Sequence, residues 1–233
     1  MVSPIWSHVA RAGMGGGGVV MIEQSDPLVL RWGASADVAE CAVLSVHGRS
    51  QDPTFMRRTS ERFGATGVRF YAPEAPGHSW YPQPFLEPLH RNRPALDDSL
   101  RVLERSLAQL AEAGFGPERV VLWGFSQGAC LLAHHVLTSP QRFAGLVLFT
   151  GGYLGQASMP ALENAPLREM PALVRSIDQD PWVPRFRVED TARLLSGAGA
   201  AVDLRIDPGD EHVITDEACA SATRLLASLR LPR

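Results

Sequence analysis

The sequence predicts an α/β protein in which helices flank a doubly wound, mostly parallel sheet. Short apolar runs alternate along the chain with segments whose apolar residues recur at helical spacing. The central runs are solidly hydrophobic, which is typical of strands buried on both faces of a parallel sheet. The expected strands cover residues 19–23, 28–32, 42–46, 68–72, 120–123, 146–150, 172–177 and 202–206.

Between these runs, helix-spaced apolar residues predict helices. In the longest segment, five leucines form one stripe that ends before Gly114, a residue suited to stopping a helix. Residues 73–94 are rich in proline and aromatic side chains and predict an ordered loop over one end of the sheet. The expected helices cover residues 55–63, 95–113, 127–137, 188–195 and 216–229.

Length and composition limit the domain organisation. The 233 residues, 45% of them hydrophobic, suit one α/β domain over residues 19–233. Residues 1–18 are glycine-rich and resemble neither a signal peptide nor a phosphate-binding loop, so they predict a flexible leader. No apolar run is long enough to span a bilayer, so no membrane span is expected.

The charge and the cysteine content indicate which partners and which cellular compartment to expect. The net charge is −3 and no block of Lys and Arg is present, so nucleic acid is not expected to bind. The three cysteines are widely spaced, which predicts buried free thiols and a reducing, cytoplasmic location. His134 and His135 are adjacent and cannot chelate together, and no acidic partner completes a ligand set, so no metal is expected. No other cofactor is expected either.

The most informative segment is Gly-Phe-Ser-Gln-Gly around Ser126. An apolar run precedes it and a helix-compatible segment follows, which is the context of a nucleophile elbow. Such a turn exposes the serine hydroxyl, and flanking glycines let strand and helix approach closely. The structural alternative is a Gly- and Ser-rich turn without chemistry.

A serine needs a base to become nucleophilic, and the base needs an orienting carboxylate. Asp180 and His212 follow Ser126 in the chain, each just after an expected strand. Asp178 is a rival for the acid, and Asp180 could instead shape a turn before proline. His212 could be a solvated surface histidine. The predicted catalytic set is Ser126, Asp180 and His212.

An oxyanion formed at this serine needs backbone donors. The N–H of Gln127 opens the helix after the serine, and the N–H of Arg49 follows a His-Gly turn at the end of an earlier strand. We therefore predict an oxyanion hole from Arg49 and Gln127, with His47 in a structural role.

These motifs resemble the phospholipase/carboxylesterase family of α/β-hydrolases, which includes acyl-protein thioesterases. Matching motifs occur in family order at residues 46–49, 72–76, 124–129, 150–154, 180–184 and 209–212. The resemblance implies the α/β-hydrolase fold, the same triad and the same two oxyanion donors. It also implies that the protein can form a homodimer.

The sequence also departs from the family pattern. Arg49 replaces a small apolar residue, which could place a cation beside the acyl site, and Ser176-Ile177 stand where the family has His-Gly. An aromatic, proline-rich segment replaces the lid-like region and predicts a compact substrate pocket. Its expected lining residues are Trp80, Tyr81, Phe85 and Trp182.

The predicted function is that of a serine hydrolase, which cleaves a small carboxylic ester or thioester through an acyl-enzyme. Two alternatives remain. The same acyl-enzyme could pass its acyl group to an alcohol or amine, as in an acyltransferase or cyclase. The chain could also be a non-catalytic module that binds a small ligand in a hydrolase-like site.

Overall fold

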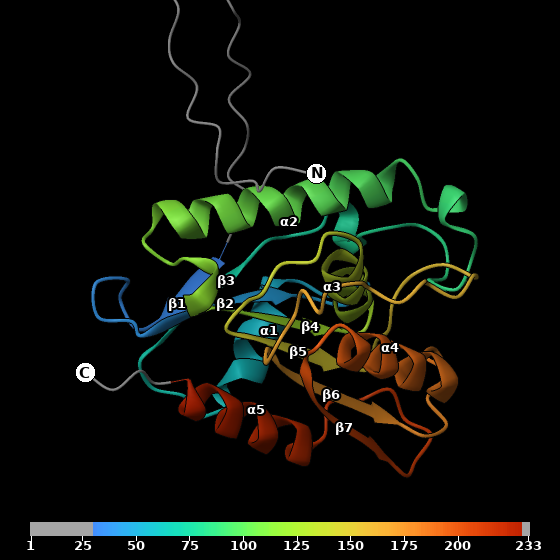
Figure 1. Ribbon diagram of the computed structural model, residues 1–233. Coiled ribbons are helices and arrows are strands. Elements are labelled where there is room, and N and C mark those ends of the chain that lie inside the picture. The colour runs from blue at the N-terminus through green and yellow to red at the C-terminus, as the bar shows by residue number, and fades with distance from the viewer. Residues whose placement is uncertain (1–29, 230–233) are drawn as a thin grey trace, which may run out of the picture.

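The computed structural model describes residues 30–229, which form a seven-stranded sheet covered by helices (Figure 1). The strand order is β1-β3-β2-β4-β5-β6-β7, and all neighbours are parallel except β1 and β3. The predicted mostly parallel sheet is confirmed. The strands are β1 (Leu30–Gly33), β2 (Cys41–Val46), β3 (Val68–Ala72), β4 (Val120–Phe125), β5 (Gly145–Phe149), β6 (Pro171–Ile177) and β7 (Ala201–Asp207).

Some of the elements expected from the sequence lie, wholly or partly, outside residues 30–229. The strand expected at 19–23, the first two residues of the strand expected at 28–32, and the leader at 1–18 lie outside the described residues. The remaining six expected strands match β2 to β7 closely.

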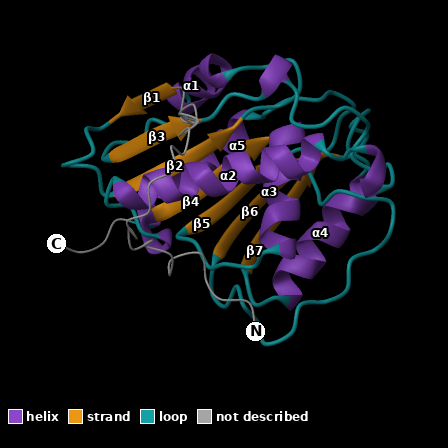
Figure 2. Ribbon diagram, turned by 90° about the horizontal axis from the view of Figure 1, so that it is seen from above, coloured by secondary structure: helices purple, strands orange, loops and turns teal. Residues whose placement is uncertain are grey.

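Five α-helices pack on the two faces of the sheet in the described part of the chain (Figure 2). α2, α3 and α4 cover one face, and their buried side chains join one hydrophobic core. α1 and α5 cover the other face and share a second core. The helices are α1 (Pro53–Glu61), α2 (Ala95–Glu112), α3 (Gln127–Thr138), α4 (Arg185–Gly197) and α5 (Asp216–Ser228).

The central strands feed both cores, because successive side chains of a strand point to opposite faces. On β4, Leu122 joins the core under α2 and α3, whereas Val121 and Trp123 join the core above α1 and α5. Every residue of β4 is buried. The uninterrupted apolar runs of the sequence therefore reflect burial on both faces.

The path of the chain opens a crevice between β2 and β4. β2 pairs with β3 on one side and β4 on the other. The helix after β2, α1, packs on one face, whereas the helix after β4, α3, packs on the opposite face. The loops that follow β2 and β4 therefore diverge at the carboxyl ends of the strands, where ligands bind in open α/β sheets.

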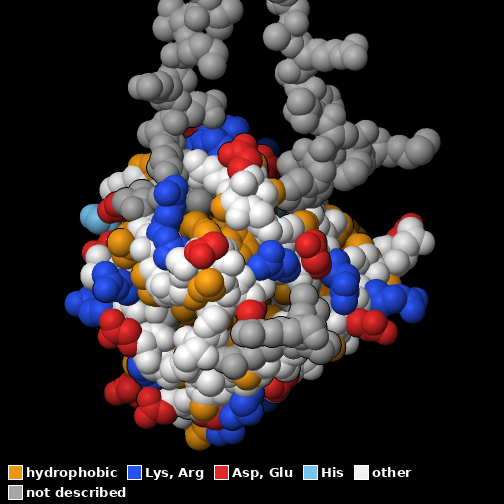
Figure 3. Space-filling model, turned by 90° about the vertical axis from the view of Figure 1, so that its left-hand side faces the viewer, with side chains coloured by type: hydrophobic (Ala, Val, Ile, Leu, Met, Phe, Trp, Pro, Cys, Tyr) orange, Lys and Arg blue, Asp and Glu red, His pale blue; other side chains and the backbone are white. Residues whose placement is uncertain are grey.

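Opposite charges are mixed on the side of the molecule seen in Figure 3. Basic and acidic side chains alternate there, and neither sign gathers into a continuous patch. Among residues 30–229, no helix combines the length and the apolar character needed to cross a membrane.

α3 carries two buried histidines whose titration should affect stability. Burial lowers the pKa of both His134 and His135 to about 4. The unfolded chain, with histidine pKa values near 6.5, therefore binds more protons than the folded protein between pH 6.5 and 4. The contribution of these neutral histidines to stability is complete above pH 6.5 and is lost as the pH falls towards 4.

We expect His135→Leu to reduce the acid sensitivity of folding. Removing one titrating group should lower the slope of unfolding free energy against pH by up to about 1.4 kcal/mol per pH unit between pH 6 and 4.5. Urea unfolding at a series of pH values measures this slope. The matched control is His90→Leu, at an exposed position. Equal slopes in both variants and the wild type would contradict the prediction.

Candidate active site

Ser126 lies in a tight turn between β4 and α3. Its φ of 53° and ψ of −120° are strained for a residue with a side chain. Two glycines make the turn possible: a Cβ at Gly128 would lie 2.1 Å from the Val46 carbonyl oxygen, and one at Gly124 would lie 2.6 Å from the Ala129 nitrogen. The elbow geometry expected from the sequence is therefore present, and it places Ser126 at the amino end of α3.

Asp180 and His212 meet although 32 residues separate them. Nδ1 of His212 lies 2.6 Å from Oδ2 of Asp180, so an ionised carboxylate there accepts the Nδ1 proton. The other oxygen, Oδ1, accepts hydrogen bonds from the N–H groups of Trp182 and Val183, both at 2.9 Å. The Asp180 side chain is fully buried. The carboxylate is therefore fixed on both oxygens and orients the imidazole.

Asp178, the rival for the acid, is engaged elsewhere. Its Oδ1 lies 2.7 Å from the Arg185 guanidinium, and both side chains are partly exposed. The structure brings Asp180, not Asp178, to His212.

Ser126 and His212 line one cavity of about 500 Å³. The imidazole packs against the Phe125 ring at a centroid distance of 5.1 Å. Within the described residues, the Ser126 hydroxyl makes no hydrogen bond. The lining residues are Arg49, Ser50, Tyr81, Pro82, Pro84, Phe85, Ser126, Gln127, Cys130, Trp182, Val183 and His212.

The two expected oxyanion donors border the same turn. Gln127 is the first residue of α3, so its N–H has no partner inside the helix. A Cβ at Gly48 would lie 3.1 Å from the Ser126 Cβ, which brings the loop of Arg49 against the serine. Within residues 30–229, neither N–H donates to another group. Both are thus available to an oxygen bound above Ser126.

The side chains of Arg49 and Gln127 hold a neighbouring loop in place, which the sequence did not reveal. The Gln127 amide accepts from the Trp80 N–H at 2.9 Å and donates to the Tyr81 carbonyl at 2.8 Å. The Arg49 guanidinium donates to the carbonyls of Tyr81, Pro82 and Gln83. Both side chains therefore hold the loop that walls the cavity against the catalytic turn.

His47 is structural in the fold, as expected. It is fully buried, and its Nε2 lies 3.1 Å from the Ala75 N–H, which donates to it. Its carbonyl accepts from the indole N–H of Trp80 at 2.8 Å.

Among the four residues expected to line the pocket, Trp80 was predicted wrongly. It is fully buried, it does not line the cavity, and its indole supports the loop from beneath. Tyr81, Phe85 and Trp182 do line the cavity. Trp182 is 71% exposed and lies at the rim, whereas Tyr81 is buried.

Cys130 lies on the cavity wall one turn of α3 after Ser126. Burial raises the pKa of its thiol to about 12, so the sulfur stays protonated. The Gly152 N–H lies 3.5 Å from Sγ. A protonated, buried thiol is a poor nucleophile.

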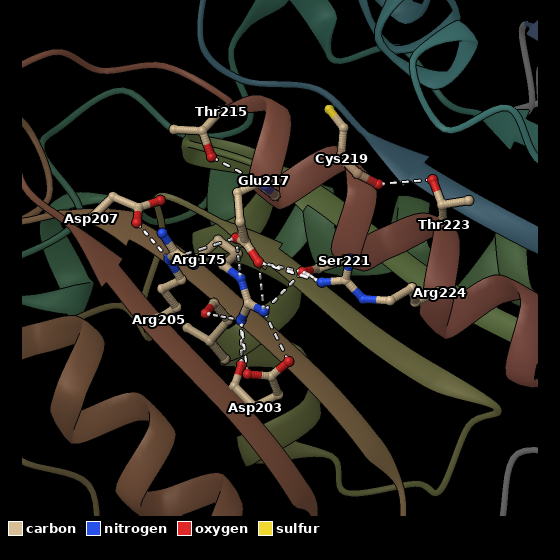
Figure 4. A network of polar contacts seen from close by, with 12 residues as sticks. Arg175, Asp203, Arg205, Asp207, Thr215, Glu217, Cys219, Ser221, Thr223 and Arg224 are labelled. Atoms are coloured by element: carbon tan, nitrogen blue, oxygen red, sulfur yellow. Dashed lines mark hydrogen bonds and ion pairs between the residues drawn. The ribbon is translucent and has the colours of Figure 1, made fainter.

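A polar network joins β6, β7 and α5 (Figure 4). Arg175 of β6 donates to Asp203 of β7 and to Glu217 and Ser221 of α5. Asp180 follows β6, and His212 lies between β7 and α5. A single guanidinium therefore links the three elements from which the loops of Asp180 and His212 extend.

We expect Arg175→Met to destabilise the fold by about 2–3 kcal/mol, because it leaves two carboxylates without their buried cation. The value is smaller than for a fully buried pair, since Asp203 is exposed and Glu217 is partly exposed, so both carboxylates can be hydrated. Urea unfolding measures the change. Arg205→Met, on the exposed side of the network, is the control and should destabilise the fold clearly less than Arg175→Met. Equal losses in the two variants would contradict this account.

The described part of the chain contains no group of three or more His, Cys, Asp or Glu side chains arranged to hold a metal ion. The three cysteines are free and buried.

The sheet topology and the elbow define an α/β-hydrolase fold with a serine-centred cavity. A sequence model of the phospholipase/carboxylesterase family matches residues 70–229. The chain belongs to this family.

Individual relatives support this placement. The chain is 30% identical to acyl-protein thioesterase 1 of Gibberella zeae over 122 residues, which cover 51% of this chain and 52% of the relative. It is 27% identical to a probable carboxylesterase SOBER1-like of Arabidopsis thaliana over 143 residues, 60% of this chain and 54% of the relative. The chain thus spans about half the length of the curated relatives it matches.

Solved structures match over more of the chain. A phospholipase/carboxylesterase from Dyadobacter fermentans is 28% identical, with a TM-score of 0.78 over 85% of this chain and 95% of that one. The esterase PE8 has a TM-score of 0.69 at 24% identity, over 86% and 97% of the two chains, and supports the fold alone.

Proposed function

We propose that this protein is a serine hydrolase that cleaves carboxylic esters or thioesters through an acyl-enzyme. One observation carries the proposal: His212, held by Asp180 through a 2.6 Å contact, lines the same cavity as a strained Ser126. A histidine with a purely structural role would not be expected to line the same cavity as a serine at a nucleophile elbow. Family membership supports the same reaction class.

In the proposed reaction, His212 takes the Ser126 proton through Nε2 while the hydroxyl oxygen attacks the substrate carbonyl. Asp180 holds the Nδ1–H tautomer and stabilises the imidazolium. The N–H groups of Arg49 and Gln127 donate to the oxyanion of the tetrahedral intermediate. His212 then protonates the leaving alkoxide or thiolate. In the second step His212 takes a proton from water, which attacks the acyl-Ser126 ester, and then returns the proton to Oγ of Ser126 as the acid leaves.

The cavity suits a small substrate. Its volume of about 500 Å³ is in the usual range for small-molecule sites, and most of its lining is apolar. Tyr81, Phe85 and Trp182 contribute aromatic surface for the acyl or leaving group.

Steady-state hydrolysis of a 4-nitrophenyl ester series and the matching thioesters tests the proposal. We expect saturable turnover with release of the free acid. Adding methanol or a primary amine separates hydrolysis from acyl transfer, because an acyltransferase would divert most product to the acceptor. Saturable binding of these compounds without any turnover would support the non-catalytic alternative and contradict the proposal.

We further propose that the domain comprises residues 19–233, that it works in the cytoplasm, where buried free thiols are stable, and that it can form a homodimer. The mixed surface charge and the net charge of −3 favour a small-molecule substrate over nucleic acid.

A further inference from the structure

Arg49 places a positive charge in the wall of the cavity. In the described residues, no carboxylate lies within ion-pair distance of its guanidinium. The cavity lining contains no Asp or Glu at all. The Arg49 charge is therefore not neutralised by an acidic side chain of the site.

The guanidinium is nonetheless fixed in position. It donates to the carbonyls of Tyr81 at 2.8 Å, Pro82 at 3.0 Å and Gln83 at 3.2 Å, and it lies over the Tyr81 ring at 6.0 Å. A guanidinium has five N–H donors, and these three bonds use three of them. Two donors, one on Nε and one on Nη1, remain without an acceptor in the described residues.

A loop clamp alone does not require a charge in this position. Gln127 holds the same loop with a neutral amide. An arginine held rigidly by carbonyls loses little entropy when it binds an anion, and its planar donors match a carboxylate or a phosphate. Arg49 is exposed and lines the cavity, so an anionic group of a ligand bound there can reach its guanidinium.

We propose that Arg49 selects esters or thioesters that carry a carboxylate or phosphate group, which its two free donors bind. This inference rests on the proposed hydrolase function and specifies its substrate class. The bound anion lies next to the Arg49 guanidinium, beside the loop that this side chain holds through the Tyr81 and Pro82 carbonyls. It belongs either to the acyl chain or to the leaving group.

Two matched pairs of substrates show whether the anionic group belongs to the acyl chain or to the leaving group. For the acyl side, mono(4-nitrophenyl) adipate is compared with 4-nitrophenyl 6-methylheptanoate, which replaces the carboxylate by an isopropyl group. For the leaving group, 3-carboxyphenyl butanoate is compared with 3-acetylphenyl butanoate. The readout is the ratio of kcat/KM for the anionic ester to kcat/KM for its neutral partner, so a general loss of activity in a variant cancels.

We expect Arg49→Gln to lower this ratio about 10- to 100-fold in one of the two pairs, as is typical of a lost charge-assisted contact. Arg49→Lys should lower it less, because the charge remains without the planar fork. In the wild type the ratio should fall as salt rises. Arg185→Gln is the control, since this exposed arginine already pairs with Asp178 and Glu189, and its ratio should match the wild type.

Failure of this inference is distinguishable from failure of the hydrolase proposal. If neutral esters are hydrolysed and both ratios stay within twofold of the wild type in Arg49→Gln, the substrate-class inference is wrong and the hydrolase remains. If no ester is hydrolysed, calorimetric binding of adipate decides. At least tenfold weaker binding of adipate to Arg49→Gln supports the anion site, and equal binding or none to the wild type overturns it.

Discussion

Ser126→Ala should lower kcat/KM for 4-nitrophenyl esters by at least about 10⁴-fold. Oγ of Ser126 is the only protein atom that bonds to the acyl group in the proposed mechanism, so its removal leaves only direct water attack assisted by the oxyanion donors. Alanine fits the same turn, and the Ser126 hydroxyl makes no hydrogen bond in the described structure, so stability should change little. Steady-state rates and urea unfolding of purified wild type and variant measure the two effects.

Ser50→Ala is the matched control for this prediction. Ser50 lines the same cavity and has a similarly positive φ of 59°, but it has no proposed role in bond formation. Its loss should lower the rate less than tenfold. A Ser126→Ala variant that retains activity comparable to that of Ser50→Ala would exclude Ser126 as the nucleophile.

Asp180→Asn should lower kcat about 10³- to 10⁴-fold while leaving the fold intact. The amide oxygen can still accept from the Trp182 and Val183 N–H groups, which turns the amide NH₂ towards His212. An NH₂ donor there requires an unprotonated Nδ1, so the imidazole carries its proton on Nε2. In that tautomer His212 cannot take the Ser126 proton.

Asp178→Asn is the control for the acid. Because Asp178 pairs with Arg185 near the surface, we expect its rate to stay within a few-fold of the wild type. A larger loss in Asp178→Asn than in Asp180→Asn would reverse the assignment of the acid.

The fold was largely predictable from the sequence, because each strand, helix and turn has a pattern within its own short segment. β4 reads as an uninterrupted apolar run because both faces of the strand are buried, and α2 shows a leucine stripe because one face of the helix packs on the core. Gly124 and Gly128 identify the elbow because any Cβ at either position would collide with backbone. Such signals depend on residues close in sequence.

Contacts between distant segments were harder to predict. Sequence alone left Asp178 and Asp180 as alternatives, because the choice depends on where the loop after β7 brings His212. Trp80 was expected in the pocket on its residue type. Its neighbour Tyr81 faces the cavity instead, since Trp80 turns inward to reach the His47 carbonyl. The Arg49 clamp joins residues 32 to 34 positions apart and has no local pattern.

The proposed mechanism requires His212 to make Ser126 reactive. Labelling with a fluorophosphonate, followed by peptide mass spectrometry, detects this activation, because the reagent bonds only to an activated nucleophile. We expect a single adduct on Ser126, none in Ser126→Ala, and much slower labelling in His212→Ala. An adduct on another residue, or undiminished labelling of Ser126→Ala, would contradict this mechanism.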